Sequence, residues 1–159
     1  MVEARDHRHH VWGIFMSSST TKHEGGTERM QPESFRARTL NLSLSVNNLA
    51  ASLAWYRDVV GFTLEQRYER EGTLRAVSLK AGSAHILINQ DDGAKGLDRV
   101  KGQGCSFMFT TAQNVDDLAN QIKATGGTLE SEPADMPWGP RVFRLRDPDG
   151  FLLVISSEK

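Results

Sequence analysis

The clearest pattern in the chain begins near residue 40, where apolar and polar residues alternate. Between residues 40 and 46 every second residue is Leu or Val, and Asn or Ser stands between them, which is typical of a half-buried strand. Asn47 or Asn48 can then cap a helix, because an Asn side chain accepts hydrogen bonds from the free N–H groups of the first turn. An apolar stripe predicts this helix over 49–60, and Gly61 ends it. Strand-like runs follow at 62–68, 74–79 and 84–88, so the segment predicts a β-α-β-β-β unit.

The same pattern returns 65 residues later. Gly61 has its counterpart in Gly126, and the tripeptide Thr-Leu-Glu at 63–65 occurs again at 128–130. Chance similarity between short strand–helix units is the alternative explanation, and the shared residues at one offset weigh against it. The second unit has a helix from about Asn114 and strands near 128–131, 141–146 and 151–156, of which the last two are joined by the turn sequence Asp-Pro-Asp-Gly. We therefore predict an α+β domain of two tandem βαβββ units, at 38–90 and 104–156, with a linker at 91–103.

Residues 1–37 lack this pattern. Between Ser17 and Pro32 the only large aliphatic residue is Met30, so the segment cannot bury enough apolar area to offset the entropy of ordering it. We predict a disordered N-terminal arm, in which Met1 and Met16 are both candidate start residues. Four of the five histidines lie in this arm, where a metal site would lack a folded frame.

Composition excludes several classes of protein. The chain has 159 residues with 19 Lys and Arg against 20 Asp and Glu, so it lacks the basic excess of a nucleic-acid-binding protein. The longest apolar runs hold about five residues, far fewer than the ~20 that cross a membrane. The single cysteine, Cys105, excludes an internal disulfide and a multi-cysteine zinc site, and we expect it to be a small core residue. The sequence predicts a cytoplasmic protein with neither nucleic acid nor membrane as partner.

Two motifs together resemble the vicinal oxygen chelate superfamily, which includes glyoxalase I, extradiol dioxygenases, and fosfomycin- and bleomycin-resistance proteins. They are Trp-Tyr-Arg-Asp-Val-Val-Gly-Phe at 55–62 and Arg-Asp-Pro-Asp-Gly-Phe at 146–151. The segment 137–143 is more similar to the bleomycin-resistance branch than to glyoxalase I. Over residues 38–156, the resemblance implies an open half-barrel with helices outside and a cavity inside. It also implies a homodimer.

The resemblance further implies where a divalent metal would bind, since metalloenzymes of the superfamily hold it on the first and last strands of each unit. Val and Ile offer no donor atom at two of these positions, so we expect no metal cofactor. His85 could become a ligand only if the strand register were shifted by one residue. The four positions fall on Asn41, Ile86, Ser106 (or Cys105 after a slip of one residue) and Val154.

A cavity without a metal is therefore the predicted site, and no residue is assigned a catalytic role. Strand alternation places small polar and apolar side chains on its walls, and pairing across the final turn is expected to bring Arg141, Phe143 and Leu145 to the same side as Leu152 and Val154. Trp138 is expected at the mouth. The candidate ligand-binding residues are Asn41, Ser43, Ser106, Met108, Trp138, Arg141, Phe143 and Val154.

Two classes of function stay open. The favoured one is a non-catalytic, antibiotic-resistance-like protein that binds or sequesters a small, partly apolar molecule. The alternative is a divalent-metal-dependent lyase or dioxygenase of the same superfamily with its ligands in a shifted register. The sequence has no Gly-x-Ser-x-Gly, no phosphate-binding loop and no His-Glu-x-x-His motif that would favour another chemistry.

Overall fold

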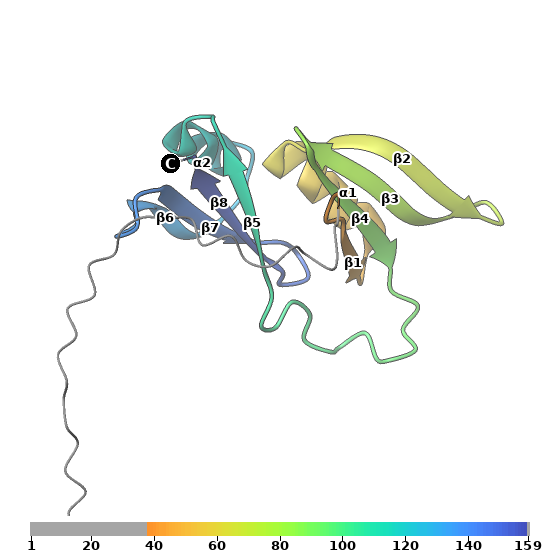
Figure 1. The fold of residues 1–159 in the computed structure, drawn as a ribbon. Coiled ribbons are helices and arrows are strands. Elements are labelled where there is room, and N and C mark those ends of the chain that lie inside the picture. Colours follow the sequence, from red (N-terminus) through yellow and green to blue (C-terminus); the bar gives the residue numbers. More distant parts are fainter. Residues whose placement is uncertain (1–37, 159) are drawn as a thin grey trace, which may run out of the picture. The chain divides into compact units, whose positions relative to one another are not determined.

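The computed structural model describes residues 38–158, in which a β-α-β-β-β order occurs twice (Figure 1). The predicted α+β fold of two tandem units is thereby confirmed. The predicted arm at 1–37 lies outside the described residues. The first unit contains β1 (Leu42–Val46), α1 (Leu49–Ala54), the π-helical segment η1 (Trp55–Val60), β2 (Thr63–Arg70), β3 (Thr73–Ala81) and β4 (Ala84–Gln90). The second contains β5 (Ser106–Thr111), α2 (Val115–Ala124), β6 (Leu129–Asp135), β7 (Arg141–Arg146) and β8 (Leu152–Ser157).

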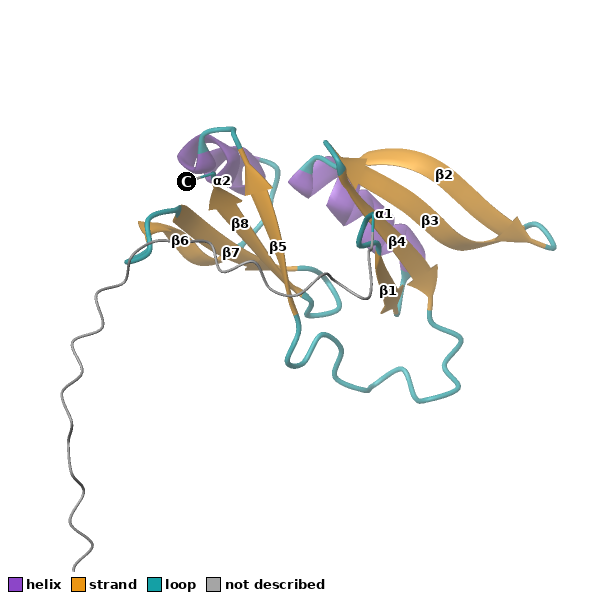
Figure 2. Cartoon of the chain, in the orientation of Figure 1, coloured by secondary structure: helices purple, strands orange, loops and turns teal. Residues whose placement is uncertain are grey.

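Each unit forms its own four-stranded sheet, and the two sheets have the same topology (Figure 2). The strand orders are β1-β4-β3-β2 and β5-β8-β7-β6, with the first and last strands of each unit parallel and the others antiparallel. Each sheet buries one face beneath the helix of its own unit and leaves much of the other face exposed. The alternation in β1 shows this directly, because Leu44 and Val46 are buried whereas Ser43 and Ser45 are exposed.

Both helices begin at an asparagine, as the sequence predicts for the first one. Asn48 Oδ1 accepts a hydrogen bond from the Ala51 N–H at 3.0 Å, and Asn114 Oδ1 accepts from Asp116 N–H and Asp117 N–H at 2.9 and 3.1 Å. The first helix widens into η1 and ends at Gly61, whose φ of 96° suits glycine.

The two units share one hydrophobic core. The Phe62 ring of the first unit meets the Phe109 ring of the second edge-on, at a centroid distance of 5.6 Å. The ends of the two helical segments also approach closely, because a Cβ atom on Gly127 would lie 2.4 Å from Ile122 Cγ2 and 2.8 Å from Val59 Cγ1. Glycine at 127 therefore permits this contact.

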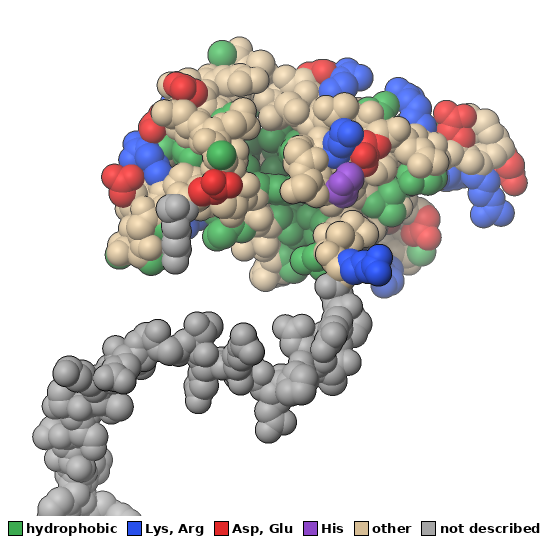
Figure 3. All heavy atoms as spheres, turned by 45° about the horizontal axis from the view of Figure 1, so that its top comes forward, with side chains coloured by type: hydrophobic (Ala, Val, Ile, Leu, Met, Phe, Trp, Pro, Cys, Tyr) green, Lys and Arg blue, Asp and Glu red, His purple; other side chains and the backbone are tan. Residues whose placement is uncertain are grey.

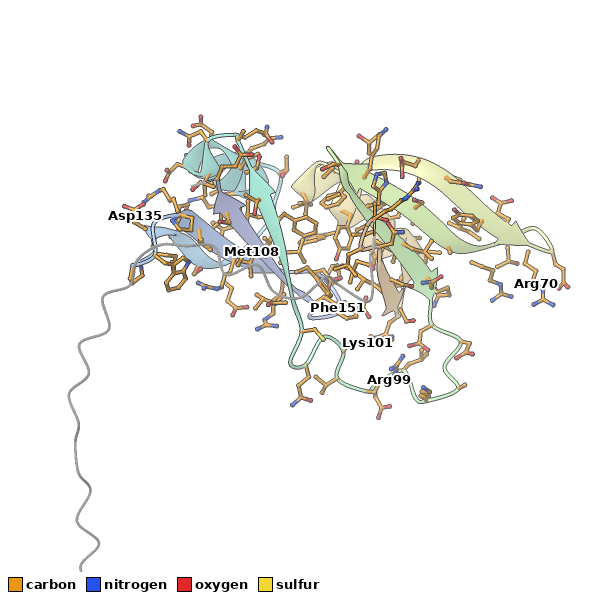
Figure 4. All side chains as sticks on the ribbon, viewed as in Figure 1. Arg70, Arg99, Lys101, Met108, Asp135 and Phe151 are labelled. Atoms are coloured by element: carbon orange, nitrogen blue, oxygen red, sulfur yellow. The ribbon has the colours of Figure 1, made fainter. Side chains whose placement is uncertain are left out.

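The linker between the units is fixed by a buried ion pair. The Lys101 side chain is 3% exposed and its Nζ donates to Asp91 Oδ2, which also accepts from Arg99. Lys101 Nζ lies 4.0 Å from Asp149 Oδ1, in the last turn of the second unit. Figure 4 shows Arg99 and Lys101 on the linker, with Phe151 above them. The linker thus connects the end of β4 to the final turn of the chain.

Candidate functional site

A cavity of about 590 Å³ lies where the end of η1 meets β5 and α2. Its floor is apolar and mostly buried, whereas its rim is exposed and largely polar. Figure 3 shows hydrophobic side chains gathered in the middle of the face that it presents. The floor consists of Phe62, Phe109, Leu118, Ile122, Phe143 and Ile155, and the rim includes Gly61, Ser83, Met108, Thr110, Gln113, Gln121 and Glu158.

The chemistry of this lining suits binding. Its volume lies within the range of roughly 300–1,000 Å³ that is usual for small-molecule sites. The only ionisable side chain among its described lining residues is Glu158, and the other polar side chains are hydroxyls and amides. Apolar contact with the floor and hydrogen bonds at the rim are what this arrangement can provide.

The strand register places several predicted residues on the exposed faces of the sheets. Met108 pairs with Val154, so both point to the side of the second sheet that faces away from α2, together with Ser106; Met108 and Ser106 are exposed there, whereas Val154 is buried. Ser43 occupies the equivalent face of the first sheet, where it pairs with Leu87, and Asn41 is exposed just before β1. Of the predicted residues, Met108 and Phe143 also line the cavity.

The register contradicts the expectation that Arg141 and Phe143 share a face with Val154. Residues 147–151 form a turn that sets Arg146 opposite Leu152, so Arg144 lies opposite Val154 and the odd-numbered residues of β7 face α2. Phe143 is fully buried in the core. Contact of these residues with a ligand stays a prediction, but their expected position was wrong because the length of the turn sets the parity of the pairing.

Arg141 instead joins β7 to the start of α2. Its Nε and Nη2 donate to Asp116 at 2.7 and 2.9 Å, and its Nη1 donates to Asp135 at 3.0 Å. The hydrogen bonds from the guanidinium hold the pKa of the Asp116 carboxyl below its usual range. The guanidinium group of Arg141 thus binds carboxylates of the protein itself. No ligand is needed to explain its position.

The strand register also corrects the metal-ligand position that the sequence analysis assigned to the last strand of the first unit. Ile86 pairs with Leu42 and is 2% exposed in the core, whereas Leu87 pairs with Ser43 as Val154 pairs with Met108. The counterpart of Val154 is therefore Leu87. Matching Gly82 with Gly150 misplaced it because the turn at 82–83 is shorter than the turn at 147–151.

His85 consequently points to the exposed face of the first sheet without any slip of register. Its Nδ1 lies 2.9 Å from Glu65 Oε2, which also accepts a hydrogen bond from Ser78 Oγ at 3.2 Å. Lys80 Nζ lies 3.8 Å from the other oxygen of Glu65. The hydrogen bond with His85 is the main reason that the pKa of Glu65 is lowered.

The residues at the four corresponding positions do not fit a divalent metal. They are Asn41, Leu87, Ser106 and Val154, of which the aliphatic pair offers no donor atom and the polar pair offers only neutral oxygens and an amide. Within residues 38–158, no group of three or more His, Cys, Asp or Glu side chains is placed to hold a metal ion.

Trp138 and Cys105 both lie in exposed positions outside the cavity. Trp138 lies in a loop closed by a hydrogen bond from the Gly139 N–H to the Met136 carbonyl at 2.9 Å, and it is 63% exposed, so it is free to contact a ligand but does not line the cavity. Cys105 is exposed, contrary to the expectation of a core residue, because it precedes β5 at the end of the linker.

Sequence reasoning missed most of the cavity, whose walls come from both units. Gly61 and Phe62, which it treated as the end of a helix and the start of a strand, line the cavity together with α2 residues such as Gln121. Glu158 was missed as well, because the repeat offset of 65 places Ser156 at the position of Asp91, and only the backbone pairing matches Glu158 with Asp91. No helix among the described residues is long and apolar enough to cross a membrane.

Comparisons with known proteins agree with this architecture. A model of the glyoxalase/bleomycin resistance protein/dioxygenase superfamily matches residues 38–155. TioX from Micromonospora sp. ML1 is similar with a TM-score of 0.64 and 22% identity, over 77% of this chain and 100% of that chain. A glyoxalase/bleomycin resistance protein/dioxygenase from Nocardioides is similar with a TM-score of 0.60 and 19% identity, over 78% of this chain and 86% of that chain.

Lactoylglutathione lyase from Agrobacterium tumefaciens gives a TM-score of 0.57 and 21% identity, over 80% of this chain and 96% of that chain. At these identities the structural similarities show the fold alone. Comparison with curated protein sequences gives no significant match. The match of the family model over nearly all of the described residues shows that the chain belongs to the glyoxalase/bleomycin resistance protein/dioxygenase superfamily.

Proposed function

We propose that the chain binds a small, partly apolar molecule in the cavity between its two units, and that binding requires no metal. The observation that carries the proposal is the lining, in which aromatic and aliphatic side chains form the floor and amide and hydroxyl groups form the rim. Membership of the superfamily supports it, because members of this superfamily commonly bind small molecules.

The side chains at the superfamily's metal positions support a proposal in which no metal takes part. The residues at the superfamily's ligand positions present two aliphatic side chains, and the imidazole of His85 is engaged by the carboxylate of Glu65. A homodimer and a cytoplasmic location, both expected from the sequence, are part of the same proposal. Sedimentation of the purified chain tests the homodimer, because a monomer at all concentrations would refute it.

Binding in the cavity can be detected at the methyl group of Met108. This side chain lines the rim and is 64% exposed, so a bound molecule shifts its ¹³C-methyl resonance, which the Met108→Leu variant identifies. A screen of small aromatic and aliphatic molecules is expected to give ligands that shift this resonance.

A cavity-filling variant locates the binding site. Ala112→Trp introduces a large side chain at the exposed rim and is expected to weaken binding of the confirmed ligands more than about tenfold. Ala94→Trp, on the exposed linker outside the cavity, is the matched control and should bind normally. If both variants bound the ligands equally well, the cavity would not be the binding site.

A metal-dependent lyase or dioxygenase is the second candidate, because His85 and Glu65 form a potential pair of ligands on the exposed face of the first sheet. Elemental analysis of the purified wild type and of His85→Ala separates the two functions. Metal-independent binding predicts no stoichiometric divalent ion in either protein. One ion per chain in the wild type that is lost in the variant would favour the metalloenzyme.

A further inference from the structure

An acidic residue follows the last strand of each unit at equivalent positions. The Asp91 N–H donates to the Val46 carbonyl at 2.9 Å, and the Glu158 N–H donates to the Thr111 carbonyl at 3.0 Å. Val46 and Thr111 end the first strands of the two units and are 65 residues apart, the spacing of the internal repeat. The backbone therefore places both carboxylates in the same way relative to their own sheets.

The surroundings of the two carboxylates differ. Asp91 is buried, and Lys101 and Arg99 of the linker donate hydrogen bonds to it. Glu158 is exposed and lines the cavity between the units. The first carboxylate therefore holds the linker in place, whereas the second contributes negative charge to the cavity.

A second source of negative potential lies on the opposite wall. The helical run of the first unit, six residues of α1 followed by six of η1, ends at Val60, and both Val60 and Gly61 line the cavity. The carboxyl end of a helical segment carries a partial negative charge. Among the described lining residues there is no Lys, Arg or His to oppose this potential.

The remaining lining suits the body of a cationic molecule. The rings of Phe62 and Phe109 can contact an apolar skeleton, and an ammonium group is attracted to aromatic faces and to side-chain oxygens such as those of Gln113 and Gln121. The thioether of Met108 adds a polarisable surface at the rim. An anion would find a carboxylate, a helix carboxyl end and no basic side chain in this lining, and the first N–H groups of α2 beside it already donate to Asn114.

We propose that the cavity selects organic cations, namely ammonium compounds with an aromatic or aliphatic body, and that Glu158 is the residue that confers this preference. The inference rests on the proposed function, because it names the class of ligand for the same cavity. The ammonium group would lie near the carboxylate at the rim and the apolar body over the phenylalanine floor.

Three probes with one carbon skeleton test the charge preference: phenylbutylammonium, phenylbutanol and phenylbutyrate. Each is titrated into the full-length chain at low salt while the Met108 methyl resonance is recorded. The cation is expected to bind about two- to fivefold more tightly than the alcohol, as for an exposed ion pair, and the anion most weakly. Added salt should reduce the preference, since exposed charges are screened.

Glu158→Gln identifies the residue responsible. The variant is expected to bind the cation and the alcohol with equal affinity, so the charge preference is measured as the ratio of the two affinities within each protein. Glu69→Gln, which makes the same change on an exposed carboxylate of β2 outside this lining, should retain the preference of the wild type.

Each outcome separates this inference from the proposed function. If the alcohol shifts the Met108 resonance and binds as tightly as the cation in the wild type, the cavity binds ligands but the charge preference is refuted. If the preference survives in Glu158→Gln, the role of Glu158 is refuted. If none of the three probes shifts the resonance, the proposed cavity site itself fails, and the inference fails with it.

Discussion

The two βαβββ units have the same strand order, the same asparagine caps and the same glycine at the end of the helical segment, yet their exposed surfaces differ. The exposed face of the first sheet carries Glu65 and His85 in a hydrogen-bonded pair, whereas the corresponding face of the second carries the exposed Met108 beside Val154, which is buried. An internal repeat thus preserves the backbone topology, which depends on a few caps, glycines and core residues. It leaves the exposed face of each unit free to acquire its own chemistry.

The last turns of the two units differ most. The first unit joins β3 to β4 through Gly82 and Ser83 alone, whereas the second uses residues 147–151 to contact the first unit. Tyr56 Oη donates to Asp147 Oδ2 at 3.0 Å, and the Asn47 N–H donates to Asp149 Oδ1 at 2.8 Å. Burial raises the pKa of both Tyr56 and Asp147. Of these two turns, the second is therefore the one that forms hydrogen bonds to the other unit.

Removal of the carboxylate in the second turn should have the largest effect on stability. Asp147→Ala is expected to lower the free energy of unfolding by about 2–4 kcal/mol, because the hydroxyl of Tyr56 loses its buried acceptor. The N–H groups of Asp149 and Phe151 lose theirs as well. Urea unfolding followed by circular dichroism measures the change.

Asp98→Ala, at an exposed linker residue, is the control and should change the free energy of unfolding by no more than about 0.5 kcal/mol. An equally small change in Asp147→Ala would show that this turn does not hold the units together.

The glycines that end the two helical segments should instead behave alike. Gly61 and Gly126 have φ values of 96° and 90°, and a Cβ atom on either would meet no other atom within 4 Å. Replacement by alanine should therefore cost about 1 kcal/mol at each position, from backbone strain alone. The same unfolding experiment checks this, and costs that differ by more than about 1 kcal/mol would break the equivalence of the units at this position.

The acidic residues that follow β4 and β8 give a smaller, pH-dependent contrast. Hydrogen bonds from Lys101 and Arg99 hold the pKa of Asp91 well below its usual range. A lowered pKa in the folded state means that the stabilisation is present above the unfolded-state value of about 4 and is lost as the pH falls.

Asp91→Asn should therefore melt a few degrees below the wild type at neutral pH and approach it below about pH 4. Differential scanning fluorimetry across this range measures the gap. A gap that stays constant with pH would mean that the charge of Asp91 is not what stabilises the linker. Glu158→Gln, at the equivalent position, is expected to melt close to the wild type at neutral pH.

Much of the fold could be predicted because its signals are local. The alternation over 40–46, the caps before residues 49 and 115 and the glycines after the helical segments each act within a few residues. The faces of the final strands could not be predicted with the same success. Leu87 and not Ile86 matches Val154, and Phe143 faces the core, because turn length decides strand parity and the two turns differ.

The sequence by itself determined the repeat, the order of strands and helices and the superfamily resemblance, whereas one of its four metal positions needed correction from Ile86 to Leu87. Only the tertiary structure decided where a molecule can bind and which charges surround it. The cavity joins Gly61 and Phe62 to β5 and α2, and no local pattern specifies that approach. Asp91 and Glu158 illustrate the reason, since equivalent residues in the repeat acquire opposite roles from the neighbours that packing brings to them.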